Sequence, residues 1–205
     1  MKSVLKYIAG QFGNPSGLGG GISTTIMNFL NQKQYKTVVE NIDIQSTDTV
    51  LDVGFGNGYL MRKLLKKNPK KIYGIEISPD MLDRATKKNP KEIEQGKMQL
   101  LLANVQKLPL ENASIDKVYT VNTVYFWSDM CQGFSEIRRI LKPGGIFLNV
   151  IYLKEWLDKL PVTQYGFSKY SLEEIEKTTR ESGLKIERIL EIQPGKSSCV
   201  VSRKE

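Results

Sequence analysis

From residue 48 onward, segments with the hydrophobic pattern of buried strands alternate with segments that have helical spacing. Short apolar runs that end at glycines or polar residues predict buried strands, over residues 49–53, 71–76, 98–102, 115–122 and 145–151. Helical spacing between these runs predicts helices, over residues 59–67, from 78 onward and over 130–141. Ser78 suits the N-cap of the second helix, with Pro79 at its first position. The alternation favours a largely parallel sheet that helices cover on both faces.

The C-terminal part adds one helix and a hairpin. Ser171 and Glu174 have the spacing of a capping box, and Gly183 stands where a C-terminal cap belongs. Two further strands, over 185–192 and 197–202, are expected to place one antiparallel strand in the sheet. The predicted fold class is therefore α/β, a three-layer sandwich with a mostly parallel seven-stranded sheet and a terminal antiparallel hairpin.

Residues 1–47 differ from the rest of the chain. A glycine-rich stretch over 13–21 does not sustain regular structure cheaply, and a helix is expected over 24–41. We therefore divide the chain into an N-terminal arm with helices, residues 1–47, and a main domain, residues 48–205.

The composition excludes several classes of protein. The 205 residues, 40% of them hydrophobic, suit one compact domain. The chain has no histidine and two distant cysteines, Cys131 and Cys199, so neither a metal site nor a histidine-dependent hydrolase is expected. No apolar stretch approaches the ~18–20 residues of a membrane span, and the first residues do not resemble a secretion signal. We expect a cytoplasmic protein.

The positive charge is concentrated in one window. The net charge is +8, and residues 60–91 hold ten Lys or Arg but three Asp or Glu. We interpret this window as the solvated face of two helices, at the sheet edge opposite the strand ends that carry the motifs below. RNA or DNA is the alternative partner, but no nucleic-acid-binding motif accompanies the window, and we do not expect nucleic acid.

The strongest motif is VLDVGFGNG at residues 50–58, where a buried strand runs into alternating glycines and then into a helix. Gly54 and Gly56 allow a tight turn and the close approach of a ligand, and free N–H groups at the helix start attract an anion. Gly58 completes a GxGxG spacing, and Tyr59 stands where the dinucleotide fingerprint GxGxxG has its last glycine. A purely structural turn is the alternative.

Polar residues follow the next three strands at the same edge of the predicted sheet. Glu76 ends the second strand, where its oxygens can accept both hydroxyls of a ribose, and Ile77 can pack on an adenine ring. Asn104 follows the third strand, within reach of an adenine amino group. Asn122 ends the fourth strand, and the aromatic residues after it lie either at the pocket mouth or in the core.

The motifs DVGFGNG, YGIEIS, ANVQKLPL, DKVYTVNTVYFW and RILKPGGIF, in this order, resemble those of class I S-adenosylmethionine-dependent methyltransferases. The most similar subgroup contains small-molecule enzymes, including C-methyltransferases of quinone biosynthesis. The resemblance is strong over residues 48–152. It implies a Rossmann-like fold, S-adenosyl-L-methionine as the cofactor and a small-molecule methyl acceptor. We expect a monomer or a homodimer.

The resemblance also implies roles for single residues. The methionine part of the cofactor would be lined by Asp52, Gly54, Gly56 and Gly58. Glu76 would hold the ribose, and the adenine would meet Ile77, Met81, Asn104 and Val105. Asn122 would lie near the cofactor's amino group. The family often has Asp where Asn104 stands, and the chain lacks the histidine that some relatives carry after the fourth strand.

Methyl transfer from a sulfonium mainly requires alignment and a dry pocket from the protein. Aromatic faces attract the sulfonium charge, so Tyr125 and Trp127 are candidate substrate contacts. On the arm, Phe12 or Tyr7 is the candidate lid residue, and Phe12 is also a candidate substrate contact. Tyr125 is also the candidate general base. The arm is expected to close over the cofactor as a lid.

The alternatives are a cofactor-binding protein without catalysis (a sensor or partner subunit), an RNA-binding or RNA-modifying protein that uses residues 60–91, and a nicotinamide-dependent enzyme, which the glycine spacing disfavours.

Overall fold

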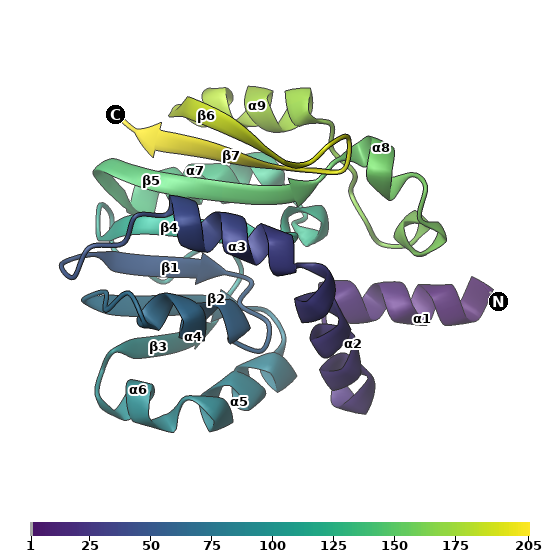
Figure 1. Cartoon of the computed structure of the whole chain (residues 1–205), viewed down its shortest axis with the longest axis horizontal. Helices are drawn as coiled ribbons and strands as arrows, with labels where there is room; N and C mark the ends of the chain where they lie inside the picture. The colour runs from purple at the N-terminus through teal and green to yellow at the C-terminus, as the bar shows by residue number, and fades with distance from the viewer. Residues whose placement is uncertain (1) are drawn as a thin grey trace.

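A seven-stranded sheet forms the centre of the computed structural model (Figure 1). The structure describes the backbone of residues 2–205 and the side chains of all of these except Leu18 and residues 21–25. The strand order is β3-β2-β1-β4-β5-β7-β6. The strands are β1 (Thr49–Val53), β2 (Lys71–Glu76), β3 (Met98–Leu102), β4 (Ile115–Val121), β5 (Leu141–Tyr152), β6 (Leu184–Gln193) and β7 (Ser197–Lys204).

The first five strands are parallel, and β7 lies antiparallel between β5 and β6. The predicted fold class and the terminal hairpin are thereby confirmed. Val53, the last residue of β1, is in register with Ile75 of β2 and Thr120 of β4. The carboxyl ends of these three strands therefore meet at one edge. Strand β1 lies between β2 and β4, so the direction in which strands are added to the sheet reverses at β1. Open α/β sheets bind ligands at such a reversal.

Helices cover both faces of the sheet. The α-helices are α1 (Lys2–Gly13), α2 (Gly17–Leu30), α3 (Gln32–Asn41), α4 (Tyr59–Leu65), α5 (Pro79–Lys88), α6 (Pro90–Glu94), α7 (Met130–Ile140), α8 (Lys154–Leu157) and α9 (Leu172–Glu181). Two 3₁₀ turns are η1 (Val124–Phe126) and η2 (Pro161–Gln164). Residues of α3 and α4 form one core with the sheet, and residues of α7 and α9 form the core on the opposite face.

The capping predictions are confirmed. The Ser78 hydroxyl accepts the N–H of Met81 at the start of α5, and Ser171 and Glu174 form both bonds of the capping box of α9. Residues of this kind satisfy backbone donors that a helix start leaves without partners.

The glycine-rich stretch is helical, contrary to the prediction. Helix α2 begins at Gly17, and it is separated from α3 at Asn31, so the expected single helix over 24–41 is two helices. A Cβ at Gly19 would lie 2.5 Å from the Tyr7 hydroxyl, and one at Gly20 would lie 2.8 Å from the Pro15 carbonyl carbon. The glycines therefore allow α1 and its connection to pack closely on α2. Met1 of the predicted arm lies outside the described residues.

Strand β5 begins at Leu141, four residues earlier than predicted, so Pro143 and Gly144 lie within it. The pairing with β4 shifts between Ile115 and Lys117, as in a bulge. Gly144 has a φ of 78°, which glycine adopts without strain.

Candidate active site

A cleft opens at the carboxyl ends of β1, β2, β3 and β4 and encloses about 940 Å³ of empty space, including its mouth. The sheet side contributes the glycine bend after β1 and the segments that follow β2, β3 and β4. The N-terminal arm forms the other wall through α1, α2 and α3. The predicted residues that line this cleft are Phe12, Gly54, Gly56, Glu76, Ile77, Asn104, Val105, Asn122 and Trp127.

The Glu76 carboxylate is fixed beneath the glycine bend. Its Oε2 accepts the N–H of Gly56 at 2.9 Å, and its Oε1 accepts the N–H groups of Ile77 at 2.8 Å and Ser78 at 3.0 Å. The residue is 6% exposed, and burial raises the pKa of its carboxyl, which the three backbone bonds partly offset. These bonds occupy three of the roughly four lone-pair sites of the carboxylate. Oε2 accepts only one N–H group, so it keeps capacity for a hydroxyl donor in the cleft.

Gly54 is required by the geometry of the bend. Its φ is 79°, and a Cβ would lie 2.5 Å from Thr123 Cγ2. A side chain here would push the bend away from β4 and close part of the cleft.

Several N–H groups of the bend are used within the fold, so fewer of them are open to an anion than expected. Gly54 donates to the Ile75 carbonyl at 2.9 Å, and the first N–H of α4, from Tyr59, donates to Asn57 Oδ1 at 3.2 Å. Gly58 is the N-cap of α4 and does not line the cleft. The main contribution of the bend is to orient Glu76 and to leave room for a ligand.

Asp52 lies behind the bend rather than on the cleft wall. It borders a smaller neighbouring pocket together with Gly54 and Tyr35, and its Oδ2 accepts the Tyr119 hydroxyl at 2.8 Å. Burial raises the pKa of Asp52 to about 8; the Tyr119 bond lowers this pKa, and the charge of Glu76 raises it. At neutral pH the carboxyl is therefore largely protonated unless a cation lies close to it.

Ile77, Asn104 and Val105 border another part of the cleft. The Ile77 side chain is 44% exposed and offers an apolar surface. The Asn104 side-chain oxygen accepts the N–H of Gln106 at 3.0 Å. Met81, which we expected to flank the adenine, is fully buried and does not line the cleft. It lies in the first turn of α5, where the Ser78 cap holds its N–H.

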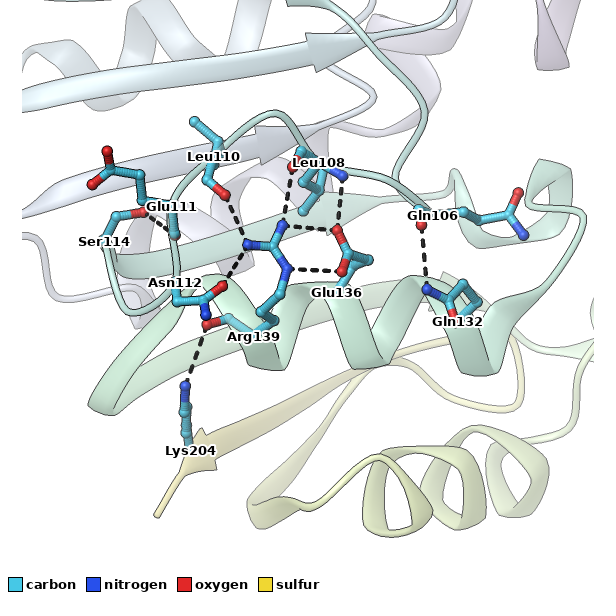
Figure 2. A network of polar contacts seen from close by, with 10 residues as sticks. All are labelled: Gln106, Leu108, Leu110, Glu111, Asn112, Ser114, Gln132, Glu136, Arg139 and Lys204. Carbon is cyan, nitrogen blue, oxygen red and sulfur yellow. Dashed lines mark hydrogen bonds and ion pairs between the residues drawn. The ribbon is translucent and has the colours of Figure 1, made fainter.

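An ion-pair network anchors the loop that follows Asn104 and Val105 (Figure 2). The Arg139 guanidinium donates to the carbonyls of Leu108 at 3.0 Å and Leu110 at 2.8 Å. It also pairs with Glu136, which accepts the N–H of Leu108. This pairing lowers the pKa of the Glu136 carboxyl. Helix α7 thereby fixes the loop that forms one wall of the cleft.

Tyr125 does not have the position of a general base. It is 2% exposed and does not line the cleft. Its hydroxyl donates to the Tyr152 carbonyl at 3.0 Å and contacts Asn122 Oδ1 at 3.2 Å. Burial raises its pKa well above the usual value of tyrosine. The geometry thus favours a structural role for Tyr125, and of the predicted aromatic contacts Phe12 and Trp127 lie on the cleft wall.

The arm supplies polar residues that the sequence analysis missed. Asn28 Nδ2 donates to Asn57 Oδ1 at 3.2 Å, and Asn122 Nδ2 donates to Asn31 Oδ1 at 3.1 Å. Tyr35 donates to Asn28 Oδ1 at 2.9 Å. Asn28 and Asn31 are three positions apart, as residues on one helix face are. This spacing was the signal in the sequence that could have identified them. They connect the arm to the glycine bend and to the end of β4.

The arm is also held at the start of α5. Ser78 Oγ donates to the Pro15 carbonyl at 2.5 Å, Gly17 donates to Asp80 Oδ2 at 2.6 Å, and Arg84 donates to the Gly17 carbonyl at 2.8 Å. The basic window, residues 60–91, therefore has two parts with different positions in the fold. Lys66, Lys67 and Lys70 precede β2, far from its carboxyl end, as expected, whereas Arg84 contacts the arm.

Comparisons with known proteins agree with this geometry. Residues 51–149 match the family described as "Methyltransferase domain". The uncharacterized methyltransferase YdaC of Bacillus subtilis (strain 168) is 33% identical over 125 residues, which cover 60% of this chain and 67% of YdaC. The demethylmenaquinone methyltransferase of Chlorobaculum tepidum is 30% identical over 124 residues, which cover 60% of this chain and 49% of that enzyme.

A solved structure shows the same fold. A SAM-dependent methyltransferase from Aquifex aeolicus superposes with a TM-score of 0.72 and 23% sequence identity, covering 85% of this chain and 93% of that one. This likeness confirms the Rossmann-like α/β sandwich. Together with the sequence matches, it shows that the chain belongs to the class I S-adenosylmethionine-dependent methyltransferases.

Proposed function

We propose that this chain transfers a methyl group from S-adenosylmethionine to a small, uncharged acceptor. The observation that carries this proposal is the charge of the cleft. Glu76 is the only Asp, Glu, Lys or Arg among the described residues that line it, and its oxygens already accept three backbone N–H groups. No lysine or arginine among these residues faces an anionic acceptor. Burying an unpaired charge in such a site is costly.

The cofactor would supply a methyl group activated on a sulfonium. The residues that fit it are those around the bend. Glu76 would accept the ribose hydroxyls, and Gly54 and Gly56 leave space for the methionine part. Ile77, Asn104 and Val105 would meet the adenine, with the amide nitrogen of Asn104 as donor because its oxygen is used within the loop. Asp52 and Asn122 would bind the amino group of the cofactor's methionine part. This group is cationic, so it would favour the ionised form of Asp52.

The cleft also constrains the acceptor's own chemistry. Tyr35, the other titratable lining residue among those described, has a pKa raised by burial. Neither it nor Tyr125 is poised to remove a proton near neutral pH. The acceptor would therefore need no base from the protein: an enol or an electron-rich phenol would attack the methyl group through carbon and then lose its proton to water, and alignment would supply most of the rate enhancement.

The arm would act as the lid of this site. Phe12, Asn28 and Asn31 line the cleft, and the bonds of Asn28 and Asn31 to Asn57 and Asn122 would hold the arm closed. Excluding water in this way protects a reactive methyl donor from hydrolysis. We extend the proposal to the division into a lid, residues 1–47, and a catalytic domain, residues 48–205.

A labelling experiment tests the function. The purified chain is incubated with S-adenosylmethionine labelled in the methyl group and with a metabolite extract separated into uncharged and anionic fractions. We expect label in one or more uncharged small molecules and none with Glu76→Gln at the same cofactor concentration. Label that appears only in anionic metabolites would contradict the acceptor class. Cofactor binding without transfer to any fraction would favour the sensor or partner-subunit alternative, and label in RNA would favour the RNA-modifying one.

The cellular setting is a further part of the proposal. Cys131 and Cys199 are free thiols, which fits a reducing compartment such as the cytoplasm. We propose that the chain works there as a monomer or a homodimer.

A further inference from the structure

The two N-terminal helices expose large apolar side chains in helical stripes. Of the nine large hydrophobic residues that are exposed in the described part of the chain, six lie on α1 and α2. They are Val4, Tyr7 and Ile8 on α1 and Ile26, Phe29 and Leu30 on α2. Each set has the i, i+3, i+4 spacing of one helix face, and Phe29 is 79% exposed. We call these six residues the arm stripes.

The arm stripes lie in a segment of the chain that has lysines but no acidic residue. Residues 1–39 contain four lysines and no acidic residue, and Glu40 is the first acid. The lysines are Lys2, Lys6, Lys33 and Lys36, and all four are exposed. Lys36 has a weak, exposed partner in Glu40 at 3.7 Å. Exposed apolar stripes flanked by lysines alone are typical of helices that lie on an anionic lipid surface.

The arm projects from the body in a way that leaves these stripes accessible. Helix α1 extends away from the sheet, and α2 runs across its inner end (Figure 1). Met27, Asn28 and Asn31 line the cleft, whereas Ile26, Phe29 and Leu30 are exposed. One helix therefore has one face toward the cleft and another toward solvent.

We propose that the arm stripes dock on the surface of a lipid bilayer that contains anionic headgroups. The apolar side chains would enter the boundary between headgroups and acyl chains, and the lysines would pair with lipid phosphates. The chain would lie on the bilayer rather than cross it, since no helix within residues 2–205 is long and apolar enough to span one. Docking would bring the arm wall of the cleft next to the lipid phase.

Vesicle co-sedimentation of the purified full chain tests the proposal. The vesicles contain phosphatidylcholine alone or a mixture with phosphatidylglycerol, at low and at high ionic strength. We expect binding to the mixed vesicles that weakens with salt and binding at least about tenfold weaker to phosphatidylcholine alone.

Two double variants locate the surface, each with a matched control. Lys2→Gln with Lys6→Gln, and Phe29→Gln with Leu30→Gln, are each expected to weaken binding about tenfold or more. Lys66→Gln with Lys67→Gln removes the same charge from α4's exposed end, and Ile189→Gln removes an exposed apolar side chain from β6. Both controls are expected to bind like the unchanged chain. The lysine variant does not depend on apolar packing, so it remains informative if the other variant unfolds.

Three results would overturn the proposal. One is an absence of binding to the mixed vesicles. Another is equal loss in Lys66→Gln with Lys67→Gln, which would assign binding to the basic window instead. The third result combines two observations: the unchanged chain does not bind vesicles, and substitution of Phe29 and Leu30 changes the oligomeric state. This would show that a second copy of the chain covers the arm stripes. None of these readouts depends on methyl transfer, so they are separate from the proposed function.

Discussion

Glu76 and Asp52 show how two buried carboxyls at neighbouring strand ends acquire different properties. Burial raises the pKa of the Glu76 carboxyl, and three backbone N–H bonds partly offset this rise. Asp52 receives one hydroxyl bond, from Tyr119, and burial dominates. The Glu76 carboxyl is therefore held in place to accept a hydroxyl donor in the cleft. Asp52 is suited to respond to a cation placed beside it.

The raised pKa of Asp52 predicts a pH dependence of stability. Its pKa is about 8 in the fold and 3.8 ordinarily, so the folded chain keeps a proton that the unfolded chain releases. The free energy of unfolding should therefore fall as the pH rises from about 4 to about 8. Asp52→Asn keeps an acceptor for Tyr119 without the titration, so thermal melting at pH 5 and pH 9 should show a smaller decrease in the variant. Parallel decreases in both proteins would contradict this assignment.

Tyr125→Phe tests the structural role of that tyrosine. The variant loses bonds to the Tyr152 carbonyl and Asn122, so we expect a loss of about 1 kcal/mol in stability. The turnover number and its pH profile should stay within a few-fold of the unchanged chain. A loss of a hundredfold or more in turnover, with a changed pH profile, would restore Tyr125 as the general base.

At the scale of elements, helix α7 fixes a loop of the cleft wall, although α7 itself does not line the cleft. Arg139 ties the loop carbonyls to α7, and the same loop begins with Asn104 and Val105 on the cleft wall. Sequence position alone separates these residues by more than thirty places. The fold brings them together because the loop runs from the end of β3 back to the start of β4, where α7 ends.

Arg139→Met removes this anchor while keeping an unbranched apolar side chain close to the length of the arginine stem. We expect a loss of about 1–2 kcal/mol in stability, reduced by the partial exposure of the pair, and weaker binding of S-adenosylhomocysteine. Arg180→Met is the control, because Arg180 forms an exposed pair with Glu176 on α9 and should leave both properties nearly unchanged. Chemical denaturation and calorimetry measure them. Equal effects of the two substitutions would argue against the anchor.

Much of the main domain could be predicted from sequence, because strand periodicity, helix caps and the glycine motif are local signals. Ser78, Ser171 and Gly54 each specify a structure within a few residues of themselves. The arm could not be predicted in the same way. The helical conformation of its glycines depends on close contact with Tyr7 and Pro15. The positions of Asn28 and Asn31 depend on partners in the glycine bend and after β4.

At the scale of the whole molecule, the cleft exists because the arm docks across the strand ends. Part of the docking is on α5, where Asp80 and Arg84 hold the two backbone groups of Gly17. The same helix carries a second pair of opposite charges, Asp83 and Lys87, at the same spacing but bonded to each other. This arrangement provides an internal control for the lid.

Asp80→Asn combined with Arg84→Gln should loosen the arm. We expect affinity for S-adenosylhomocysteine to fall about three- to tenfold, as for the loss of one or two hydrogen bonds, and the arm to become more sensitive to limited proteolysis. Asp83→Asn combined with Lys87→Gln makes the same change of charge and should alter neither property. Deletion of residues 2–21 should weaken binding and turnover further. If the deletion leaves both unchanged, the arm is not a lid.

The central claim is that Glu76, held beneath the glycine bend, binds the ribose of the cofactor in the cleft. Calorimetric titration with S-adenosylhomocysteine tests it most directly, with Glu76→Gln compared to Glu111→Gln on an exposed loop. The account predicts one site per chain, at least about tenfold weaker in Glu76→Gln and unchanged in Glu111→Gln. Binding of equal strength in all three proteins, or no binding by the unchanged chain, would contradict it.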